Sequence, residues 1–204
     1  MPALPLIDGP DPAQIADALA AIGACRVTDF PDAVATAALR TDLLRLHEAH
    51  ALREAAVGHG QDKALRQDIR GDSTLWLDDA ACAEAARDYL AQLDALRTTL
   101  NRELFLGAVE VEAHYACYPP GAFYRKHRDR FKDSDLRVVS VVAYLNADWQ
   151  EGDGGVLRLY LPDGQIDVLP QAGTSVIFRS ELEHEVLPAT RQRLSIAAWM
   201  RRRG

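Results

Sequence analysis

Three polar residues in the second half of the chain have the types and the spacing to bind a metal ion. His127 and Asp129 are separated by one residue, and His184 lies further along within residues 181–186. Side chains two residues apart in a β-strand point to the same face, so His127 and Asp129 can share one ion. Two imidazoles and one carboxylate form the facial triad of non-haem iron, which leaves coordination positions open. A closed structural zinc site needs four protein ligands instead.

The His-x-Asp pair alone is a weak signal, because a surface histidine beside a solvated acid gives the same pattern. The remaining histidines give even weaker evidence of metal binding. His47 and His50 are one residue short of the metalloprotease spacing, and we expect both to be exposed. His59 lies in a glycine-bounded loop and His114 lies on a predicted strand, neither with a partner at ligand spacing. The metal hypothesis therefore depends on further features.

Arg193 supplies one such feature, because it follows His184 closely and begins the last predicted strand. Ser195, Ala197 and Trp199 share its face, and the opposite face is apolar, so both faces look enclosed. An enclosed guanidinium needs an anionic partner, and its fork fits a carboxylate through two parallel hydrogen bonds. A salt bridge to one of the chain's own acids is the alternative interpretation.

The elements that must position these residues change from helices to strands along the chain. Apolar residues recur at helical spacing in the first half, which predicts helices over roughly 11–23, 32–50 and 80–106. Asp11 and Pro12 are typical of a helix cap and first turn, and Gly23 should end that helix. Asp78 and Asp79 are the expected caps of the third helix.

The period changes to two from Val109 to Tyr118, which is typical of a long strand. Pro119-Pro120-Gly121 then turns the chain. Further strands are predicted near 122–129, 137–146, 155–161, 165–169, 174–179, 183–188 and 192–200. Short strands with tight turns and no helix-length crossovers favour an antiparallel jelly roll over a parallel sheet.

Together these patterns predict an α+β fold with helices packed outside a jelly roll. We expect a single domain over residues 1–204, with helical support over 1–106 and a β core over about 107–200.

Composition argues against several classes of binding partner. A net charge of −7 gives no electrostatic footprint for nucleic acid, and we interpret the terminal Arg201-Arg202-Arg203 as a solvated tail. No stretch approaches the length of an apolar membrane span, and the start lacks a secretion signal, so we expect no membrane partner and a cytoplasmic location. Three separated cysteines lack the paired spacing of a zinc site or a disulfide framework.

With these residues placed, the sequence resembles the prolyl-hydroxylase branch of the 2-oxoglutarate oxygenases, especially the oxygen-sensing prolyl hydroxylases and their bacterial relatives. The resemblance spans roughly residues 65–200 and is carried by several separated segments in matching order. They are Ile69-Arg70-Gly71-Asp72 with Trp76, Tyr115-Ala116-Cys117-Tyr118-Pro119, His127-Arg128-Asp129, Tyr144-Leu145-Asn146, Trp149, Gly154-Gly155-Val156-Leu157-Arg158, His184-Glu185-Val186, and Arg193 with Trp199.

The resemblance implies a double-stranded β-helix that binds Fe(II) through His127, Asp129 and His184. It implies 2-oxoglutarate and O2 as cosubstrates and ascorbate as a reductant, with the far carboxylate of 2-oxoglutarate on Arg193. The implied reaction hydroxylates a C–H bond and converts 2-oxoglutarate to succinate.

Further residues take implied roles around this centre. Tyr118 and Tyr144 are implied to line the cosubstrate pocket, for which ordinary barrel packing is the alternative. The implied substrate-binding residues are Arg70, Asp72, Trp76 and Trp199. A plain hairpin turn would explain Gly71 and Asp72 equally well.

The substrate that this resemblance favours is a proline within a protein, hydroxylated at the 4-position, with elongation factor Tu as the leading candidate. Two departures argue against an animal-type transcription-factor peptide: residues 119–126 are shorter than in the animal enzymes, and the sequence stops soon after Trp199. The alternatives are a hydroxylase of a free amino acid or small metabolite, and a non-catalytic metal-binding jelly-roll module. A halogenase is disfavoured because Asp129 occupies the position that halide would take.

Overall fold

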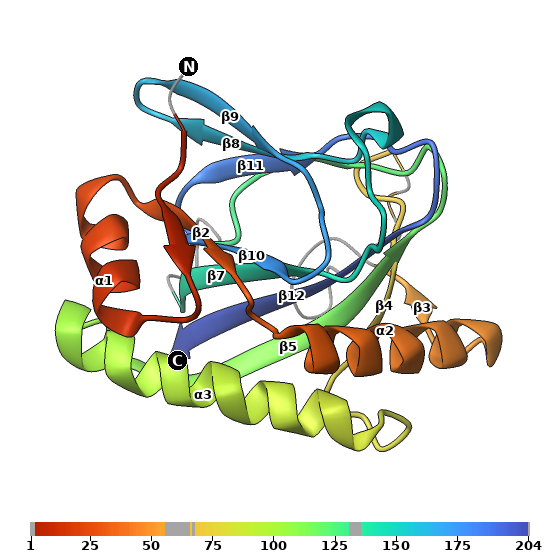
Figure 1. The fold of residues 1–204 in the computed structure, drawn as a ribbon, viewed down its shortest axis with the longest axis horizontal. Coiled ribbons are helices and arrows are strands. Elements are labelled where there is room, and N and C mark those ends of the chain that lie inside the picture. Colours follow the sequence, from red (N-terminus) through yellow and green to blue (C-terminus); the bar gives the residue numbers. More distant parts are fainter. Residues whose placement is uncertain (1–2, 56–65, 67, 131–135, 204) are drawn as a thin grey trace.

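Two β-sheets face each other, and three helices cover the outer face of the larger one (Figure 1). This computed structural model describes residues 3–55, 66, 68–130 and 136–203. Strands of the larger sheet are β1 (Leu6–Asp8), β2 (Ala24–Thr28), β3 (Arg53–Glu54), β4 (Ser73–Trp76), β5 (Ala108–Tyr118), β7 (Arg137–Tyr144), β10 (Thr174–Arg179) and β12 (Arg193–Arg202). Strands of the smaller sheet are β6 (Tyr124–His127), β8 (Leu157–Leu161), β9 (Gly164–Val168) and β11 (Glu183–Val186).

The strand order is β1-β2-β10-β7-β12-β5-β4-β3 in the larger sheet and β6-β11-β8-β9 in the smaller. Every strand pair is antiparallel except β1 with β2, within the part of the chain that the structure describes. The predicted α+β class and the predicted jelly-roll arrangement are therefore confirmed. The first 106 residues were expected to be helical support, yet they also contribute β1, β2, β3 and β4 to the larger sheet.

The helices are α1 (Pro12–Ala21), α2 (Ala33–Glu48) and α3 (Glu84–Leu104). The predicted cap of α1 is confirmed, since the Asp11 carboxylate accepts hydrogen bonds from the first-turn backbone N–H groups. The predicted caps of α3 at Asp78 and Asp79 are wrong. Its N-cap is Ala83, whose backbone N–H donates to Oδ2 of Asp42 at 2.9 Å, so a carboxylate from α2 replaces a local cap.

Apolar side chains fill two layers on opposite faces of the larger sheet. The layer beneath the helices joins residues such as Leu19, Leu43 and Leu93 to Ile196 and Met200 of β12. The layer between the sheets contains, among others, Tyr118, Tyr144, Leu159 and Phe178. Burial of each large aliphatic side chain stabilises the fold by roughly 1.5–3 kcal/mol relative to leaving it exposed. Because β12 is buried on both faces, it forms a rigid platform for any polar residue on its inner face.

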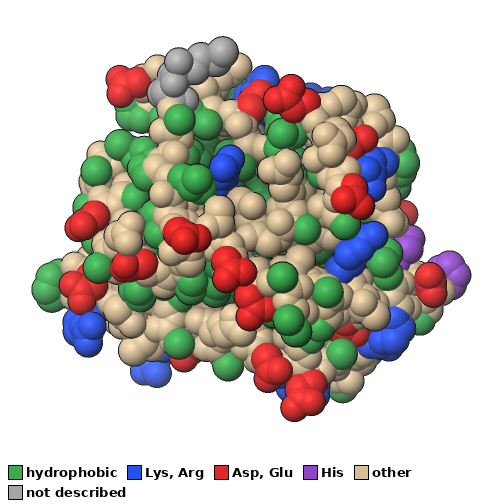
Figure 2. Space-filling view, in the orientation of Figure 1, with side chains coloured by type: hydrophobic (Ala, Val, Ile, Leu, Met, Phe, Trp, Pro, Cys, Tyr) green, Lys and Arg blue, Asp and Glu red, His purple; other side chains and the backbone are tan. Residues whose placement is uncertain are grey.

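Acidic and basic side chains are interspersed over the face of the molecule drawn in Figure 2. The prediction of a solvated tail at Arg201-Arg202-Arg203 is wrong for its first two residues, because β12 extends to Arg202 and Arg201 pairs with Glu112 at 2.9 Å. Among the helices that the structure describes, none combines the length and the apolar character needed to cross a bilayer.

Candidate metal centre

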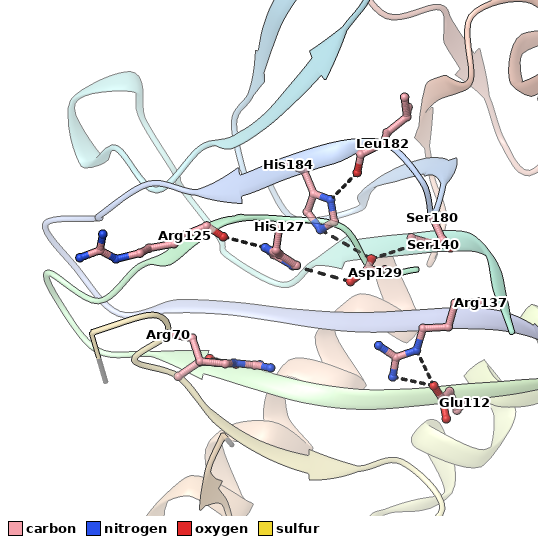
Figure 3. Close-up of polar contacts among 11 residues, drawn as sticks. Arg70, Glu112, Arg125, His127, Asp129, Arg137, Ser140, Ser180, Leu182 and His184 are labelled. Carbon is pink, nitrogen blue, oxygen red and sulfur yellow. Dashed lines mark hydrogen bonds and ion pairs between the residues drawn. The ribbon is translucent and has the colours of Figure 1, made fainter. Parts of the chain in front are cut away.

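His127, Asp129 and His184 converge between the two sheets, as the sequence predicted (Figure 3). One ligand atom from each lies within 4.8 Å of the others. Nε2 of His127 is 3.7 Å from Oδ1 of Asp129, and Nε2 of His184 is 3.6 Å from Oδ2 of the same carboxylate. This geometry suits one metal ion placed among the three atoms, with the remaining coordination positions open to the cavity.

The reason for this convergence differs from the predicted strand alternation. β6 ends at His127, so Asp129 lies beyond the strand. The neighbouring strand β11 aligns His184 with His127 and Val186 with Tyr124, which leaves one extra residue in β6. This irregularity, a β-bulge, allows the ring of Tyr124 to stack on that of His127 with centroids 3.6 Å apart.

Both imidazoles are held in one tautomer by backbone carbonyls. Nδ1 of His127 donates to the carbonyl of Arg125 at 2.7 Å, and Nδ1 of His184 donates to that of Leu182 at 3.0 Å. A carbonyl can only accept, so each Nδ1 carries the proton and each Nε2 presents a lone pair. This is the usual outer-shell arrangement of a metal-binding histidine.

Asp129 is held from the opposite sheet. Its Oδ2 accepts a 2.7 Å hydrogen bond from the hydroxyl of Ser140 on β7, and Ser140 is 2.8 Å from the hydroxyl of Ser180. The sequence patterns missed Ser140 and Ser180, because the contact depends on how the sheets stack.

Burial and charge set the protonation states of the centre. Burial disfavours the charged form of Asp129, but the imidazoles of His184 and His127 outweigh it and hold the pKa of that carboxyl well below its usual range. Burial also lowers the pKa of His184 to about 4. A carboxylate and a neutral imidazole at neutral pH are the forms that bind a metal.

Arg193 lies on β12, on the face of the larger sheet that points toward the smaller sheet. It is buried, with 1 % of its surface exposed. Its Nε donates to the carbonyl of Gly155 at 2.8 Å and its Nη1 to the hydroxyl of Ser195 at 3.1 Å. Nη2 of Arg193 and the hydroxyl of Tyr144 are both buried and form no hydrogen bond with the described residues. Buried polar atoms normally have partners, so these two groups indicate an anionic ligand that supplies acceptors.

Tyr118 and Tyr144 flank this guanidinium, whose Cζ lies 5.2 Å and 5.3 Å from their ring centroids. Burial raises the pKa of both phenols, so they remain protonated hydrogen-bond donors. Gly155 makes the approach of Arg193 possible, because a Cβ at that position would lie 3.2 Å from Cδ of Arg193 and 2.9 Å from Cβ of Ala189.

A cavity of about 790 Å³ joins the metal ligands and Arg193 to Arg70, Trp76 and Trp199. Asp72 was also predicted to contact substrate, but its side chain is fully buried and does not line this cavity. Its carboxylate pairs with Nε and Nη2 of Arg70 at 2.7 Å and 2.5 Å. Asp72 therefore fixes Arg70, whose guanidinium lies over the ring of Tyr124 at 4.4 Å.

His114, which the sequence patterns left without a partner, also lines this cavity. It is buried, and its ring lies 5.3 Å from that of Trp76 and 5.2 Å from that of Trp199. The exposure predicted for His47 and His50 is confirmed. His59 lies outside the described residues.

Comparison with known proteins decides the family. The model of the 2OG-Fe(II) oxygenase superfamily matches residues 113–201. A Pseudomonas putida prolyl-4-hydroxylase structure is 46% identical with a TM-score of 0.85, covering 94% of this chain and 99% of that chain. The chain belongs to the 2OG-Fe(II) oxygenase superfamily. Its two sheets are accordingly the double-stranded β-helix of these oxygenases.

Further relatives of this oxygenase chain are an Egl nine protein and a prolyl hydroxylase. Human Egl nine homolog 1 is 30% identical over 190 residues, covering 87% of this chain and 43% of the human protein. A Trichoplax adhaerens prolyl hydroxylase, in complex with a hypoxia inducible factor peptide fragment, is 26% identical with a TM-score of 0.82, covering 93% of this chain and 88% of that one. The chain spans about half the length of the first Egl nine relatives that it matches.

The residues of this chain fit the iron and the 2-oxoglutarate for which the superfamily is named. The two imidazoles and one carboxylate are a donor set for Fe(II), and O2 needs the open positions that three protein ligands leave. The unpartnered guanidinium nitrogen of Arg193 and the phenol of Tyr144 fit the distal carboxylate of 2-oxoglutarate.

Proposed function

We propose that this oxygenase hydroxylates a prolyl residue in a protein or peptide and converts 2-oxoglutarate to succinate and carbon dioxide in the same reaction. The observation that carries the proposal is the unsatisfied guanidinium nitrogen of Arg193, in the same cavity as the His127, Asp129 and His184 centre. A metal site that served only as scaffold would have no use for such an anchor. The non-catalytic alternative is therefore disfavoured.

His127, Asp129 and His184 hold Fe(II) in this proposal through two Nε2 atoms and one carboxylate. Bound iron, with 2-oxoglutarate and O2, supplies the oxidising chemistry that places one oxygen atom on the proline and the other in succinate. Ser140 and the carbonyls of Arg125 and Leu182 orient the three ligands, so the centre is preorganised before any cosubstrate binds.

Arg193 orients 2-oxoglutarate in this proposal by pairing with its distal carboxylate, and Tyr144 donates a further hydrogen bond. Tyr118 closes the pocket on the other side of the guanidinium. Because these groups are buried, water is largely excluded and each charged contact is stronger than it would be in bulk solvent.

The substrate occupies the open end of the cavity, between Arg70, Trp76 and Trp199. Trp76 is 44% exposed and can cover an incoming chain, whereas Trp199 is 7% exposed and forms part of the floor. Asp72 keeps the guanidinium of Arg70 in place at the rim. Burial of an aromatic surface against proline would supply affinity without fixing the rest of the substrate sequence.

A protein substrate is favoured over a free metabolite by the relatives. The Trichoplax adhaerens enzyme was solved with a peptide fragment, and the resemblance of this chain extends to the Arg70, Asp72 and Trp76 segment. We propose a cytoplasmic translation factor, with elongation factor Tu as the first candidate, because an exposed loop can enter a mouth that a folded surface cannot. Ascorbate is the proposed reductant that keeps the iron ferrous.

The test is incubation of the Fe(II)-loaded enzyme with elongation factor Tu and with cell extract, followed by peptide mapping by mass spectrometry. One added oxygen should be found on a proline, dependent on 2-oxoglutarate and absent with Asp129→Ala. Turnover of free proline or another metabolite, with no modified protein, would instead establish the small-molecule alternative. A wild-type protein that never consumes 2-oxoglutarate would contradict both.

A further inference from the structure

His114 lies on the inner floor of the substrate cavity. On β5, Tyr115 and Cys117 pack beneath the helices, whereas Ala116 and Tyr118 pack between the sheets. His114 alternates with the latter pair and therefore faces the metal centre. Its register partners are Ala197 on β12 and Trp76 on β4.

The strand order of the larger sheet fixes how far His114 lies from the metal centre. Ser140, which holds Asp129, is on β7, and β12 is the only strand between β7 and β5 in the described sheet. Ala197 of β12 pairs with His114 on one side and with Val142 on the other, so Ser140 lies two residues further along β7. Two inter-strand spacings of about 4.8 Å and two residue rises of about 3.4 Å place the Cα of His114 about 12 Å from that of Ser140. A residue next to the reacting proline would lie at this distance, whereas the proline itself must be closer to the ligands.

The ring nitrogen Nε2 of His114 can accept a hydrogen bond but cannot donate one. Its Nδ1 is 3.0 Å from the carbonyl of Tyr115, so Nδ1 donates and Nε2 presents its lone pair. Burial lowers the pKa of this imidazole to about 4, and the nearby guanidinium of Arg70 acts in the same direction. The ring is therefore neutral at physiological pH.

We propose that His114 is a specificity-determining residue that accepts a hydrogen bond from the backbone N–H of the substrate residue following the target proline. The inference rests on the proposed prolyl hydroxylase function. Proline has no N–H of its own, and the N–H of the following residue is the closest backbone donor to its ring. This contact selects a peptide bond after proline, which free proline lacks.

Trp199 provides the complementary group beside it. Its Nε1 is buried and forms no hydrogen bond with the described residues, although indole N–H groups usually find a partner. In an extended chain the N–H and C=O of one residue point to the same side. One acceptor on His114 and one donor on Trp199 therefore match a single extended residue.

The test compares two defined probes. They are acetyl-Ala-Pro-Ala amide and the same peptide N-methylated at the alanine after proline, which replaces the N–H in question with N–CH3. Comparison with a variant that lacks the acceptor separates loss of the hydrogen bond from the effect of the added methyl group. Binding is measured to enzyme loaded with Mn(II) and 2-oxoglutarate, through paramagnetic broadening of the probe resonances, which detects weak binding without turnover. His114→Phe keeps an aromatic ring between Trp76 and Trp199 but removes the acceptor, and His114→Gln restores an acceptor.

N-methylation should weaken binding to the wild type about tenfold more than binding to His114→Phe, as expected for one hydrogen bond to a buried acceptor. His114→Gln should recover part of the discrimination, and all three proteins should bind 2-oxoglutarate alike. Equal losses on N-methylation in the wild type and in His114→Phe would overturn the inference and leave the prolyl hydroxylase function intact. Binding of free L-proline, with neither peptide bound, would overturn both.

Discussion

The hydroxyl of Ser140, on the larger sheet, donates a 2.7 Å hydrogen bond to Oδ2 of Asp129, which follows the last residue of a strand in the smaller sheet. The metal centre is thus tied to both sheets at once. Since Ser140 donates to a carboxylate, Ser180 must donate to Ser140, and the two hydroxyls form a chain that ends on Asp129.

Ser140→Ala should therefore lower metal affinity by about 10-fold or more, the usual effect of losing an outer-shell partner. Ser180→Ala is the matched control and should have a smaller effect, because Ser180 contacts Asp129 only through Ser140. Metal affinity can be measured by competition with a chromogenic chelator. Unchanged affinity in Ser140→Ala would show that Asp129 needs no support.

Loss of a metal ligand should differ from loss of the cosubstrate anchor. His184→Ala should lose metal, because two protein ligands do not complete the site. Arg193→Ala should retain metal and bind 2-oxoglutarate more weakly by roughly 2–5 kcal/mol. Arg191→Ala, which removes a half-exposed arginine nearby, is the control. Normal 2-oxoglutarate binding by Arg193→Ala in titration calorimetry would refute the anchor assignment.

Gly155→Ala should disturb the pocket around Arg193 without contacting any of the three metal-binding residues. Gly155 has a φ of +68°, and its added Cβ would lie 2.9 Å from Cβ of Ala189 and 3.2 Å from Cδ of Arg193. Overpacking of this kind typically costs about 1–3 kcal/mol of stability. We expect a lower melting temperature and weaker 2-oxoglutarate binding with metal retained, whereas Gly152→Ala has open space and should match the wild type.

Two arginine-aspartate pairs of the same spacing offer a direct contrast in burial. Asp72 is fully buried beside Arg70, whereas the side chains of Asp68 and Arg66 are more than half exposed. Asp72→Ala leaves a largely buried guanidinium without its partner and should destabilise the fold by roughly 3–5 kcal/mol. Asp68→Ala should change stability little. Similar melting temperatures for the two variants would contradict the role given to Asp72.

Local sequence patterns predicted the strong elements and the residues that follow from them. The three helices, the strands after residue 107 and the neighbourhood of His127, Asp129 and His184 were all expected. Arg193 was also expected to be enclosed, because apolar residues occupy both faces of its strand. These features depend on periodicity within one segment, which a single sequence displays.

Features that depend on contacts between distant segments could not be predicted in this way. The stacking of Tyr124 on His127 depends on a register irregularity in β6, and periodicity does not reveal it. Asp42 binds the start of α3 from another helix, so the local candidates Asp78 and Asp79 were misleading. Likewise, His114 acquires its neighbours Trp76 and Trp199 only when three strands pair.

The central claim is that this cavity couples consumption of 2-oxoglutarate to hydroxylation of a prolyl residue. The most direct measurement supplies isotopically heavy dioxygen to wild-type enzyme with Fe(II), 2-oxoglutarate and the unhydroxylated form of the protein identified in extract, then locates the label by mass spectrometry. We predict one heavy oxygen atom on the proline and the other in succinate, with neither product formed by Asp129→Ala. Hydroxyproline without label, or formed while 2-oxoglutarate remains unconsumed, would contradict the account.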